Sequence, residues 1–343
     1  MRCLVTGGAG FIGSQLVREL VQLQHRVIVV DNLVNGKAEN LEGLPRQQVD
    51  LMVADIRDIE IMAETMRGVD VVFHLACLGV RHSIHSPLEN HEVNATATLK
   101  LLSTARAVGA GRFVYVSSSE VYGTARWVPM TEEHPTFPMT VYGASKLAGE
   151  CCARAFYHTY GYPTVIVRPF NTYGPRCHHE GDSGEVIPKF LLRSIAGRPM
   201  IVLGDGSQTR DFTYVSDTAK GILLAGLSEH AIGQTINLGS GREIAIKQLA
   251  DAVAAVVGKG SAEVIHMDSR PGDVLRLCAD TSKARALLAF APEVSLREGL
   301  QRLGEWYSRL GRSSETLLEE EIMRNWESSR EEDTCLISSP SFL

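Results

Sequence analysis

The chain has 343 residues, of which 44% are hydrophobic and 22% are charged. This composition excludes a wholly disordered or collagen-like chain, and the length favours two domains or one large α/β domain with an added lobe. The formal net charge of −6 gives no sign of nucleic-acid binding, and no apolar run approaches the roughly 18 residues of a membrane span.

The first half of the chain alternates short β-branched runs with longer segments of helical periodicity, which predicts βαβ units. We therefore expect a Rossmann-type, doubly wound parallel sheet with helices on both faces, an α/β fold. The predicted buried strands are residues 3–6, 27–30, 51–54, 71–75, 113–117 and 164–167, and the predicted helices are residues 11–23, 59–66, 89–108 and 142–160.

The character of the sequence changes near Asn171, where Pro, Gly and His cluster before further helices and short strands at residues 201–203 and 235–238. We expect a Rossmann domain over residues 1–171 and a smaller, mixed α/β lobe over residues 172–310 that is interleaved with it. Residues 311–343 are predicted to be an acidic tail, because residues 313–333 hold eight acidic residues against two arginines. A solvated tail is preferred over a docking helix with Leu317, Leu318, Ile322 and Trp326 on one face.

A glycine-rich loop follows the first predicted strand and opens the first helix. Gly7 allows a tight turn, Gly10 allows close approach of a pyrophosphate, and Gly13 allows close packing of helix on strand. The helix N-terminus adds free N–H groups and partial positive charge. Asp31 ends the second strand, where a carboxylate accepts hydrogen bonds from an adenosine ribose and repels a 2′-phosphate, so NAD is expected as the cofactor. Asp55, after the third strand, is placed to reach the adenine amine.

Tyr142 and Lys146 are four residues apart on a predicted helix and so share one face. A free phenol has a pKa of about 10, but a neighbouring ammonium and a nicotinamide cation favour phenolate, which makes Tyr142 a competent base toward a sugar hydroxyl. Ser117 to Glu120 end the fifth strand, and sites of parallel α/β sheets lie at such carboxyl ends.

With these motifs in order, the chain resembles the extended short-chain dehydrogenase/reductase family of NAD-dependent nucleotide-sugar epimerases and dehydratases, from Met1 to about Tyr307. Further matching motifs are Asp31-Asn32, Asp55-Ile56-Arg57, His74-Leu75-Ala76, Val121-Tyr122-Gly123, Arg168-Pro169-Phe170-Asn171, Gly204-Asp205-Gly206, Arg210-Asp211 and Arg270-Pro271-Gly272-Asp273.

The resemblance implies a role for each matching residue. Ser118 would hold the sugar O4, Tyr142 would be the base, Lys146 would bind the nicotinamide ribose, and Ser119 would contact substrate. Asn171, Arg210 and Arg270 would hold the diphosphate, with Asp273 near the nucleotide ribose. The implied cofactor-binding residues are Gly7, Gly10, Phe11, Ile12, Gly13, Asp31, Asn32, Asp55, Ile56, Leu75, Ala76, Tyr142, Lys146 and Pro169.

The position of Glu120 bears on the reaction, because a carboxylate beside the sugar C5 can remove its proton once C4 is a ketone. We expect 4,6-dehydration of an NDP-hexose with Glu120 as a catalytic residue, although Ser119 stands where the usual glucose dehydratases have an Asp acid. The alternatives are a 4-epimerase of the UDP-glucose or UDP-GlcNAc type and then a UDP-glucuronate decarboxylase. A non-catalytic nucleotide-binding regulator is disfavoured by the intact Ser118, Tyr142 and Lys146.

The remaining signals concern surroundings and partners. Cys177-His178-His179-Glu180 is interpreted as part of a lid or specificity loop rather than a metal site, and Arg81, His82 and His85 face either the sugar or solvent. Seven cysteines without the spacing of a disulfide framework indicate reduced thiols and a cytoplasmic protein, and the first strand runs directly into glycines rather than into a signal-peptide core. The expected partners are a UDP-, dTDP- or GDP-sugar and, by resemblance, a second copy of the chain that packs through residues 89–108 and 142–160.

Overall fold

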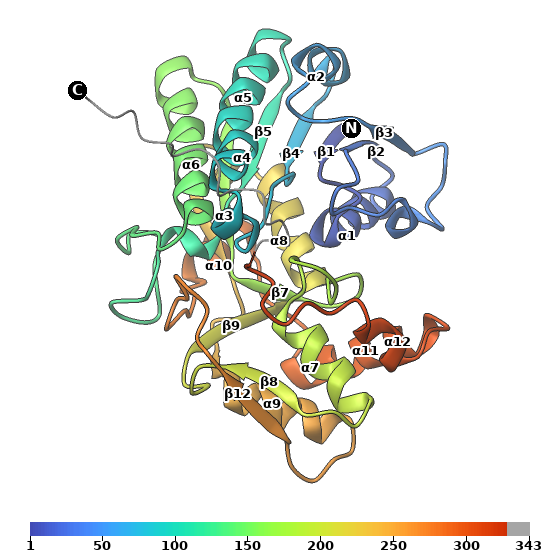
Figure 1. The fold of residues 1–343 in the computed structure, drawn as a ribbon. Coiled ribbons are helices and arrows are strands. Elements are labelled where there is room, and N and C mark those ends of the chain that lie inside the picture. The colour runs from blue at the N-terminus through green and yellow to red at the C-terminus, as the bar shows by residue number, and fades with distance from the viewer. Residues whose placement is uncertain (328–343) are drawn as a thin grey trace, which may run out of the picture.

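A computed structural model describes residues 1–327 and centres on a seven-stranded parallel sheet (Figure 1). The strand order is β10-β6-β5-β4-β1-β2-β3, so the first six strands have the order of a Rossmann fold, as predicted. The strands are β1 (Arg2–Thr6), β2 (Arg26–Asp31), β3 (Val49–Val53), β4 (Val71–His74), β5 (Arg112–Val116), β6 (Thr164–Pro169) and β10 (Thr235–Leu238).

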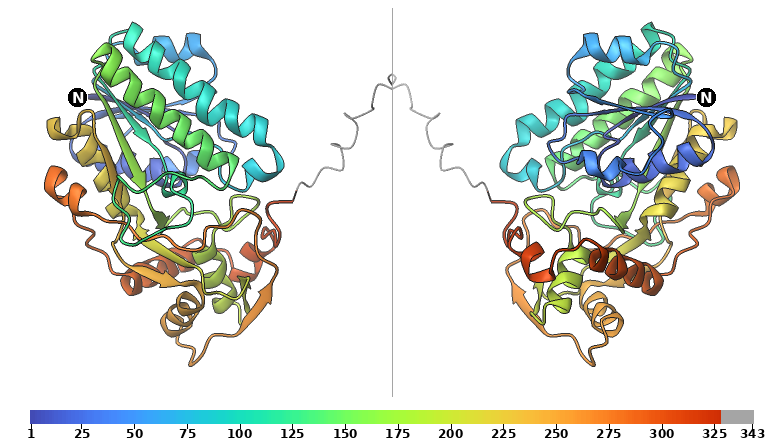
Figure 2. Two further views of the ribbon diagram at one scale, coloured as in Figure 1. Left: turned by 90° about the vertical axis from the view of Figure 1, so that its left-hand side faces the viewer. Right: turned by 90° about the vertical axis from the view of Figure 1, so that its right-hand side faces the viewer.

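Helices cover both faces of this sheet (Figure 2). Residues of α1 and α8 form one buried cluster with the sheet, and residues of α2, α5 and α6 form another on the opposite face. The helices of this layer are α1 (Phe11–Gln22), α2 (Ile59–Met66), α3 (His82–His85), α4 (Pro87–His91), α5 (Ala97–Ala107), α6 (Val141–Tyr160), α8 (Val215–Leu227) and α10 (Ser282–Leu288). Short turns of helix are η1 (Ala38–Leu41), η2 (Glu92–Thr96), η3 (Ser119–Val121) and η4 (Glu229–Ala231).

The predicted helix 89–108 is confirmed as helix, because α4, the π-helical turn η2 and α5 follow one another without a gap over residues 87–107. One expectation for this layer is wrong in detail. The third strand, expected to be buried, lies at the sheet edge, where Met52 and Val53 are 39% and 62% exposed. The apolar composition of β3 therefore does not mean that this strand is buried between helices on both faces of the sheet.

The smaller lobe lies below the sheet in Figure 1 and carries two small sheets. One has the order β11-β9-β7 and the other pairs β12 with β8 in parallel. Their strands are β7 (Asn171–Tyr173), β8 (Met200–Leu203), β9 (Thr209–Tyr214), β11 (Glu243–Ala245) and β12 (Val264–Met267), and the helices are α7 (Val186–Ile195), α9 (Ile246–Val256), α11 (Leu296–Arg309) and α12 (Ser314–Leu318).

The two parts are interwoven along the chain. After β9, helix α8 and strand β10 return to the main sheet, where β10 pairs with β6. The boundaries predicted at residues 171 and 310 remain a prediction. No helix within residues 1–327 is long and apolar enough to cross a membrane.

The described part of the predicted acidic tail, residues 311–327, packs against the smaller lobe rather than lying in solvent. Helix α12 spans only Ser314–Leu318, and Leu317, Leu318 and Trp326 are buried, whereas Ile322 is exposed. The four apolar residues therefore do not form one face of a single helix. Residues 328–343 of the tail prediction lie outside the described part of the chain.

Candidate active site

One cleft of about 590 Å³ runs from the carboxyl ends of the parallel strands into the smaller lobe, and every predicted site residue lines it. The set comprises all fourteen predicted cofactor-binding residues, from Gly7 to Pro169, together with Ser118, Ser119, Glu120, Asn171, Arg210, Arg270 and Asp273. Segments far apart in sequence therefore meet at one place, while the role of each residue remains a proposal.

The glycine loop is shaped for close approach of a ligand to backbone. Gly7 has φ +70° and donates its N–H to the Val30 carbonyl at 2.8 Å. A Cβ on Gly13 would lie 2.1 Å from the Gly7 carbonyl oxygen, so any side chain there would force α1 away from β1. The N-terminus of α1 has no side-chain cap, which leaves its first N–H groups for an anion such as the diphosphate of a dinucleotide.

Two carboxylates line the far end of this loop. Asp31 accepts hydrogen bonds from the N–H groups of Ala9 (3.0 Å) and Leu33 (2.9 Å). Burial raises the pKa of Asp31, and these hydrogen bonds partly offset that shift. Asp55 is held by the guanidinium of Arg57 at 2.9 and 2.8 Å and by Asn32 at 3.1 Å. The hydrogen bonds from Arg57 lower the pKa of Asp55 to about 2. These residues fit the adenosine half of NAD, because Asp31 would meet a 2′-phosphate with negative charge.

Tyr142 and Lys146 lie on α6 beside the end of β5. The Lys146 Nζ donates to the Val116 carbonyl at 2.9 Å and lies 5.8 Å from the centroid of the Tyr142 ring. Burial raises the pKa of Tyr142 well above its ordinary value, with Cys77, Glu120 and Glu185 acting in the same direction and a hydrogen bond with Ser118 opposing them. Without ligands Tyr142 is therefore a phenol, and it needs added positive charge before it can act as a base.

Glu120 is only 8% exposed, and its Oε2 has no hydrogen-bond partner within residues 1–327. Glu120 lies two residues after Ser118. The Ser118 Oγ accepts a hydrogen bond from the Glu120 N–H at 3.2 Å and so caps the turn η3. A buried carboxylate oxygen without a partner is costly, and because Glu120 lines the cleft, a bound substrate would be near enough to supply one.

The predicted phosphate-binding residues converge in the smaller lobe. Arg210 and Arg270 both donate to Oδ1 of Asp273, at 2.7 and 2.6 Å. Within residues 1–327 the buried Asn171 Oδ1 and Arg270 Nε have no hydrogen-bond partner. Two guanidiniums sharing one carboxylate leave net positive charge for a diphosphate.

The structure adds cleft residues that the sequence did not single out, Glu185 above all. Glu185 is the N-cap residue of α7, yet its side chain makes no capping bond. Burial raises its pKa, and the charge of Arg81, which lines the same cleft, opposes that shift. His82 also lines the cleft, whereas His85 contacts Asp182 at 3.4 Å. No motif in the sequence marked Glu185, because the placement of its side chain in the cleft depends on the tertiary packing of α7.

Known proteins resemble the chain over nearly all of this architecture. The family model described as GDP-mannose 4,6 dehydratase matches residues 4–303. A protein named putative UDP-glucose 4-epimerase, from Methanocaldococcus jannaschii, is 35% identical over 313 residues, which cover 90% of this chain and 99% of that protein. UDP-glucuronic acid decarboxylase 1 of Arabidopsis thaliana is 37% identical over 312 residues, covering 88% of this chain and 69% of that protein.

A solved structure with the same fold is DesIV, a dTDP-glucose 4,6-dehydratase from Streptomyces venezuelae with NAD and TYD bound. It superposes with a TM-score of 0.84 at 34% identity, covering 90% of this chain and 98% of DesIV. The resemblances thus span three different reactions on one architecture.

Proposed function

Because the chain belongs to the extended short-chain dehydrogenase/reductase family of nucleotide-sugar epimerases and dehydratases, we propose that it is an NAD-dependent 4,6-dehydratase of an NDP-hexose. The observation that carries this proposal is Glu120, a buried residue that lines the same cleft as Tyr142 and whose Oε2 has no hydrogen-bond partner within residues 1–327. A 4-epimerase has no step that requires this group.

The glycine loop and Asp31 would hold NAD, which when bound would supply an acceptor for the hydride of the sugar C4 and a donor of that hydride to C6 after the C6 hydroxyl has left. Tyr142 removes the proton of the C4 hydroxyl, with Ser118 hydrogen-bonded to the same oxygen and Lys146 favouring phenolate. The resulting 4-ketone acidifies the C5 hydrogen, which Glu120 removes. Arg210, Arg270 and Asn171 hold the diphosphate and so fix the sugar against these groups.

Loss of the C6 hydroxyl also needs an acid, and we propose Glu185 for this role. Ser119 has no acidic proton near neutral pH, whereas burial raises the pKa of Glu185 and keeps its proton to higher pH. Both Glu120 and Glu185 are near enough to raise the pKa of Tyr142, which is consistent with two carboxylates around one sugar.

The second candidate is 4-epimerisation, which relatives such as the Methanocaldococcus protein carry in their names. It would use Ser118 and Tyr142 in the same way and leave Glu120 without a chemical role. Decarboxylation of a uronate is the third candidate. The uronate carboxylate would lie near Glu120 and Glu185, which repel it, and Arg81 is the cation near Glu185.

The test is proton NMR of the protein with UDP-, dTDP- and GDP-hexoses in deuterated water. Dehydration produces a C6 methyl signal with deuterium at C5, and Glu120→Gln should slow its appearance by about 10²–10⁴-fold. Glu133→Gln, an exposed glutamate outside this cleft, is the matched control. Interconversion of 4-epimers without deuterium at C5, unaffected by Glu120→Gln, would replace the proposal with epimerisation.

We further propose that the protein works in the cytoplasm as a homodimer. The six cysteines within residues 1–327 are all free thiols, which is consistent with a reducing compartment. The proposed dimer uses exposed residues of α5 and α6.

A further inference from the structure

The C-terminal segment, residues 313–327, lies beyond residues 4–303 that the family model matches, yet it reaches the cleft. Glu321, Met323 and Asn325 all line the cleft. The segment therefore forms a part of the cleft wall that lies outside the matched residues.

Buried anchors fix the segment on the smaller lobe. Leu317 and Leu318 join the hydrophobic cluster that contains α7, and Trp326 is 8% exposed. Between these anchors the Glu321 carboxylate accepts from Nε of Arg193 at 2.9 and 3.1 Å, and both side chains are largely buried. The Lys189 ammonium donates to the Ile322 carbonyl at 2.9 Å. The intervening residues are therefore held in place by α7.

The segment also fastens residues 177–185, called the cleft loop here, which begin with the four residues from Cys177 to Glu180 that were predicted to be part of a lid or specificity loop. The buried Asn325 amide donates to the carbonyls of Asp182 and Gly184 at 3.1 Å each and to that of Gly181 at 3.4 Å. The Gly181 N–H donates back to the Glu320 carbonyl at 3.0 Å. One side chain thus satisfies three neighbouring backbone groups of the loop.

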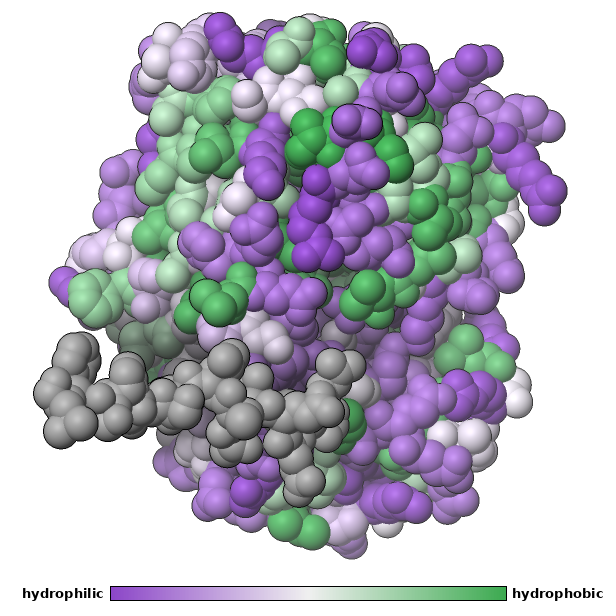
Figure 3. All heavy atoms as spheres, turned by 45° about the horizontal axis from the view of Figure 1, so that its top comes forward, coloured by the Kyte–Doolittle hydropathy of each residue, from purple (hydrophilic) through white to green (hydrophobic). Residues whose placement is uncertain are grey.

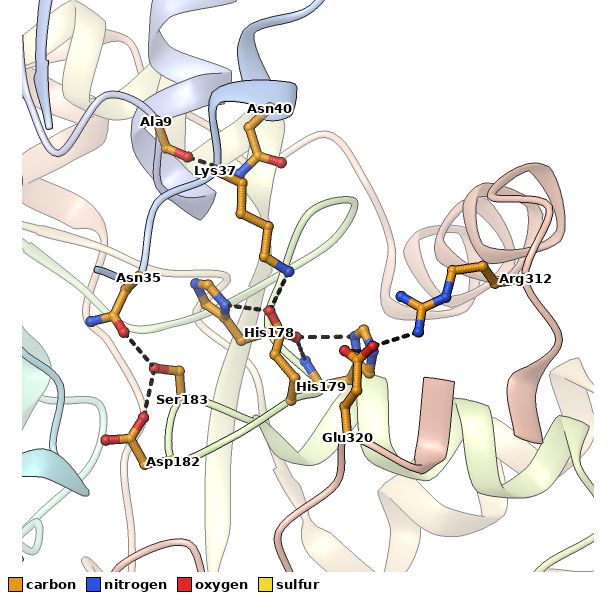
Figure 4. Close-up of polar contacts among 11 residues, drawn as sticks. Ala9, Asn35, Lys37, Asn40, His178, His179, Asp182, Ser183, Arg312 and Glu320 are labelled. Carbon is orange, nitrogen blue, oxygen red and sulfur yellow. Dashed lines mark hydrogen bonds and ion pairs between the residues drawn. The ribbon is translucent and has the colours of Figure 1, made fainter. Parts of the chain in front are cut away.

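On its other side the cleft loop contacts the cofactor-binding layer (Figure 4). The Lys37 ammonium reaches Glu180 at 2.6 Å, and Ser183 donates to Asn35 at 3.4 Å. His178 and His179 lie against Glu180, and His179 also faces Glu320 of the C-terminal segment. The loop therefore spans the cleft between the two parts, with the C-terminal segment as its support.

Met323 lines the cleft beside α7 and next to Arg324, whose Nη2 lies 3.3 Å from Asp268 after β12. The Met323 sulfur is 3.1 Å from Nη2 of Arg193. This lobe lines the cleft with apolar and aromatic side chains, among them Phe190, Ile201, Leu203, Phe212 and Ile246, and also with polar and charged ones such as Lys189, Arg193 and Gln208. Such a lining suits the face of a nucleobase, and a thioether adapts to its shape.

We infer that the C-terminal segment completes the nucleoside end of the substrate cleft, with Met323 contacting the nucleoside and Asn325 acting as a positioning residue through the cleft loop. This inference rests on the proposed function, since it assumes a nucleoside diphosphate as the bound group.

The first test measures binding of UDP, dTDP and GDP to the full chain by isothermal titration calorimetry. Met323→Ala removes a contact without emptying the core, because this side chain is 42% exposed, and should weaken the preferred nucleotide by about tenfold. Ile322→Ala is the matched control, a neighbour of similar exposure (45%) whose side chain does not line the cleft. It should bind as the wild type does.

The second test concerns Asn325. Asn325→Ala should raise KM for the nucleotide sugar several-fold, because it loosens the cleft loop. It should also lower kcat, because the loop ends at Glu185, the proposed acid. Hydrogen exchange should accelerate in residues 177–185 and not in α2. Asn325→Gln, which keeps the amide donor, should recover part of the affinity.

These measurements distinguish failure of the proposed function from failure of the inference about the C-terminal segment. If the wild type binds none of the three nucleotides, the proposed function fails and this inference fails with it. If the wild type binds one of them and both Met323→Ala and Asn325→Ala bind it equally well, only this inference is wrong. Tighter binding by the variants would also overturn it, because it would show a segment that blocks the site.

Discussion

The chemistry of the cleft depends on charges placed around a single phenol. Burial, Cys77, Glu120 and Glu185 all raise the pKa of Tyr142, so the protein by itself favours the protonated form. The Lys146 ammonium on the same helix favours phenolate, and a cationic nicotinamide would add to it. The base would therefore become competent mainly when the cofactor is in place, which couples proton removal to readiness for hydride transfer.

The pair of carboxylates leads to a prediction for Glu185→Gln. If Glu185 is the acid for the C6 hydroxyl, methyl formation should fall by about 10²–10⁴-fold. The wild-type rate should fall as pH rises through the pKa of Glu185, because only the protonated form acts and burial has raised that pKa. The Glu185→Gln variant should not show this fall in rate on the alkaline limb of the pH profile. The measurement is methyl production by NMR across pH 6 to about 10.

The substitution Glu185→Asp is the conservative comparison, and it should restore part of the rate and of the limb. An unchanged pH profile in Glu185→Gln would assign the acid to another group, with Ser119 and bound water as the next candidates. Nucleotide affinity, measured in parallel, should stay near that of the wild type.

At the scale of elements, the junction of β1 and α1 sets the shape of the cofactor end. Gly13 lies in the first turn of α1, and the Gly7 carbonyl occupies the space that a side chain at position 13 would need. Gly13→Ala should destabilise the fold by about 1–3 kcal/mol and weaken NAD binding, since helix and strand must separate. Thermal melting and NAD titration measure the two effects.

Gly260→Ala is the control for this change, because Gly260 has no atoms near the added Cβ and no positive φ. It should melt within about a degree of the wild type, given that surface changes usually stay within ±0.5 kcal/mol. Equal melting of the two variants would mean that α1 can shift without cost.

Several elements could be predicted because their cause is local. The buried strands β1, β4, β5 and β6 are apolar runs at the sheet centre, and the glycine spacing identified the first βα turn. The π-helical turn inside the predicted helix 89–108 coincides with tertiary contacts. Asn90 and Asn94 turn inward and bond the backbone of Leu78 and Gly79, which no periodicity reveals.

At the scale of the molecule, the cleft collects residues from nearly the whole chain. Motif spacing at a strand end and on a helix predicted Asp31 and Tyr142 as site residues, and the family resemblance predicted Arg270. All three line the cleft, while their roles remain predictions. Glu185 and Met323 carry no such pattern, and their place depends on how α7 and the C-terminal segment pack. The acidic composition predicted that the C-terminal segment lies in solvent. Arg193, Lys189 and buried apolar side chains instead hold its described part on the smaller lobe.

The exposed side of the α5–α6 layer supports the last prediction, a homodimer. On the face that carries these helices, hydrophobic side chains lie among hydrophilic ones (Figure 3). Leu99 on α5 and Tyr160 on α6 are 45% and 51% exposed. Isologous packing of two such helix pairs would cover both residues in each copy and form a four-helix interface. Light scattering at micromolar concentration should then give twice the mass of one chain.

The substitution Leu99→Glu tests which surface pairs. Because a two-fold axis brings the same patch of both copies together, it buries two new carboxylates at once and should give the mass of one chain. Leu275→Glu, equally apolar and 65% exposed but in the segment after Arg270, should leave the dimer intact. A monomeric wild type, or a dimer that only Leu275→Glu dissociates, would contradict the α5–α6 interface. Nucleotide binding should persist in monomeric Leu99→Glu, because Leu99 does not line the cleft.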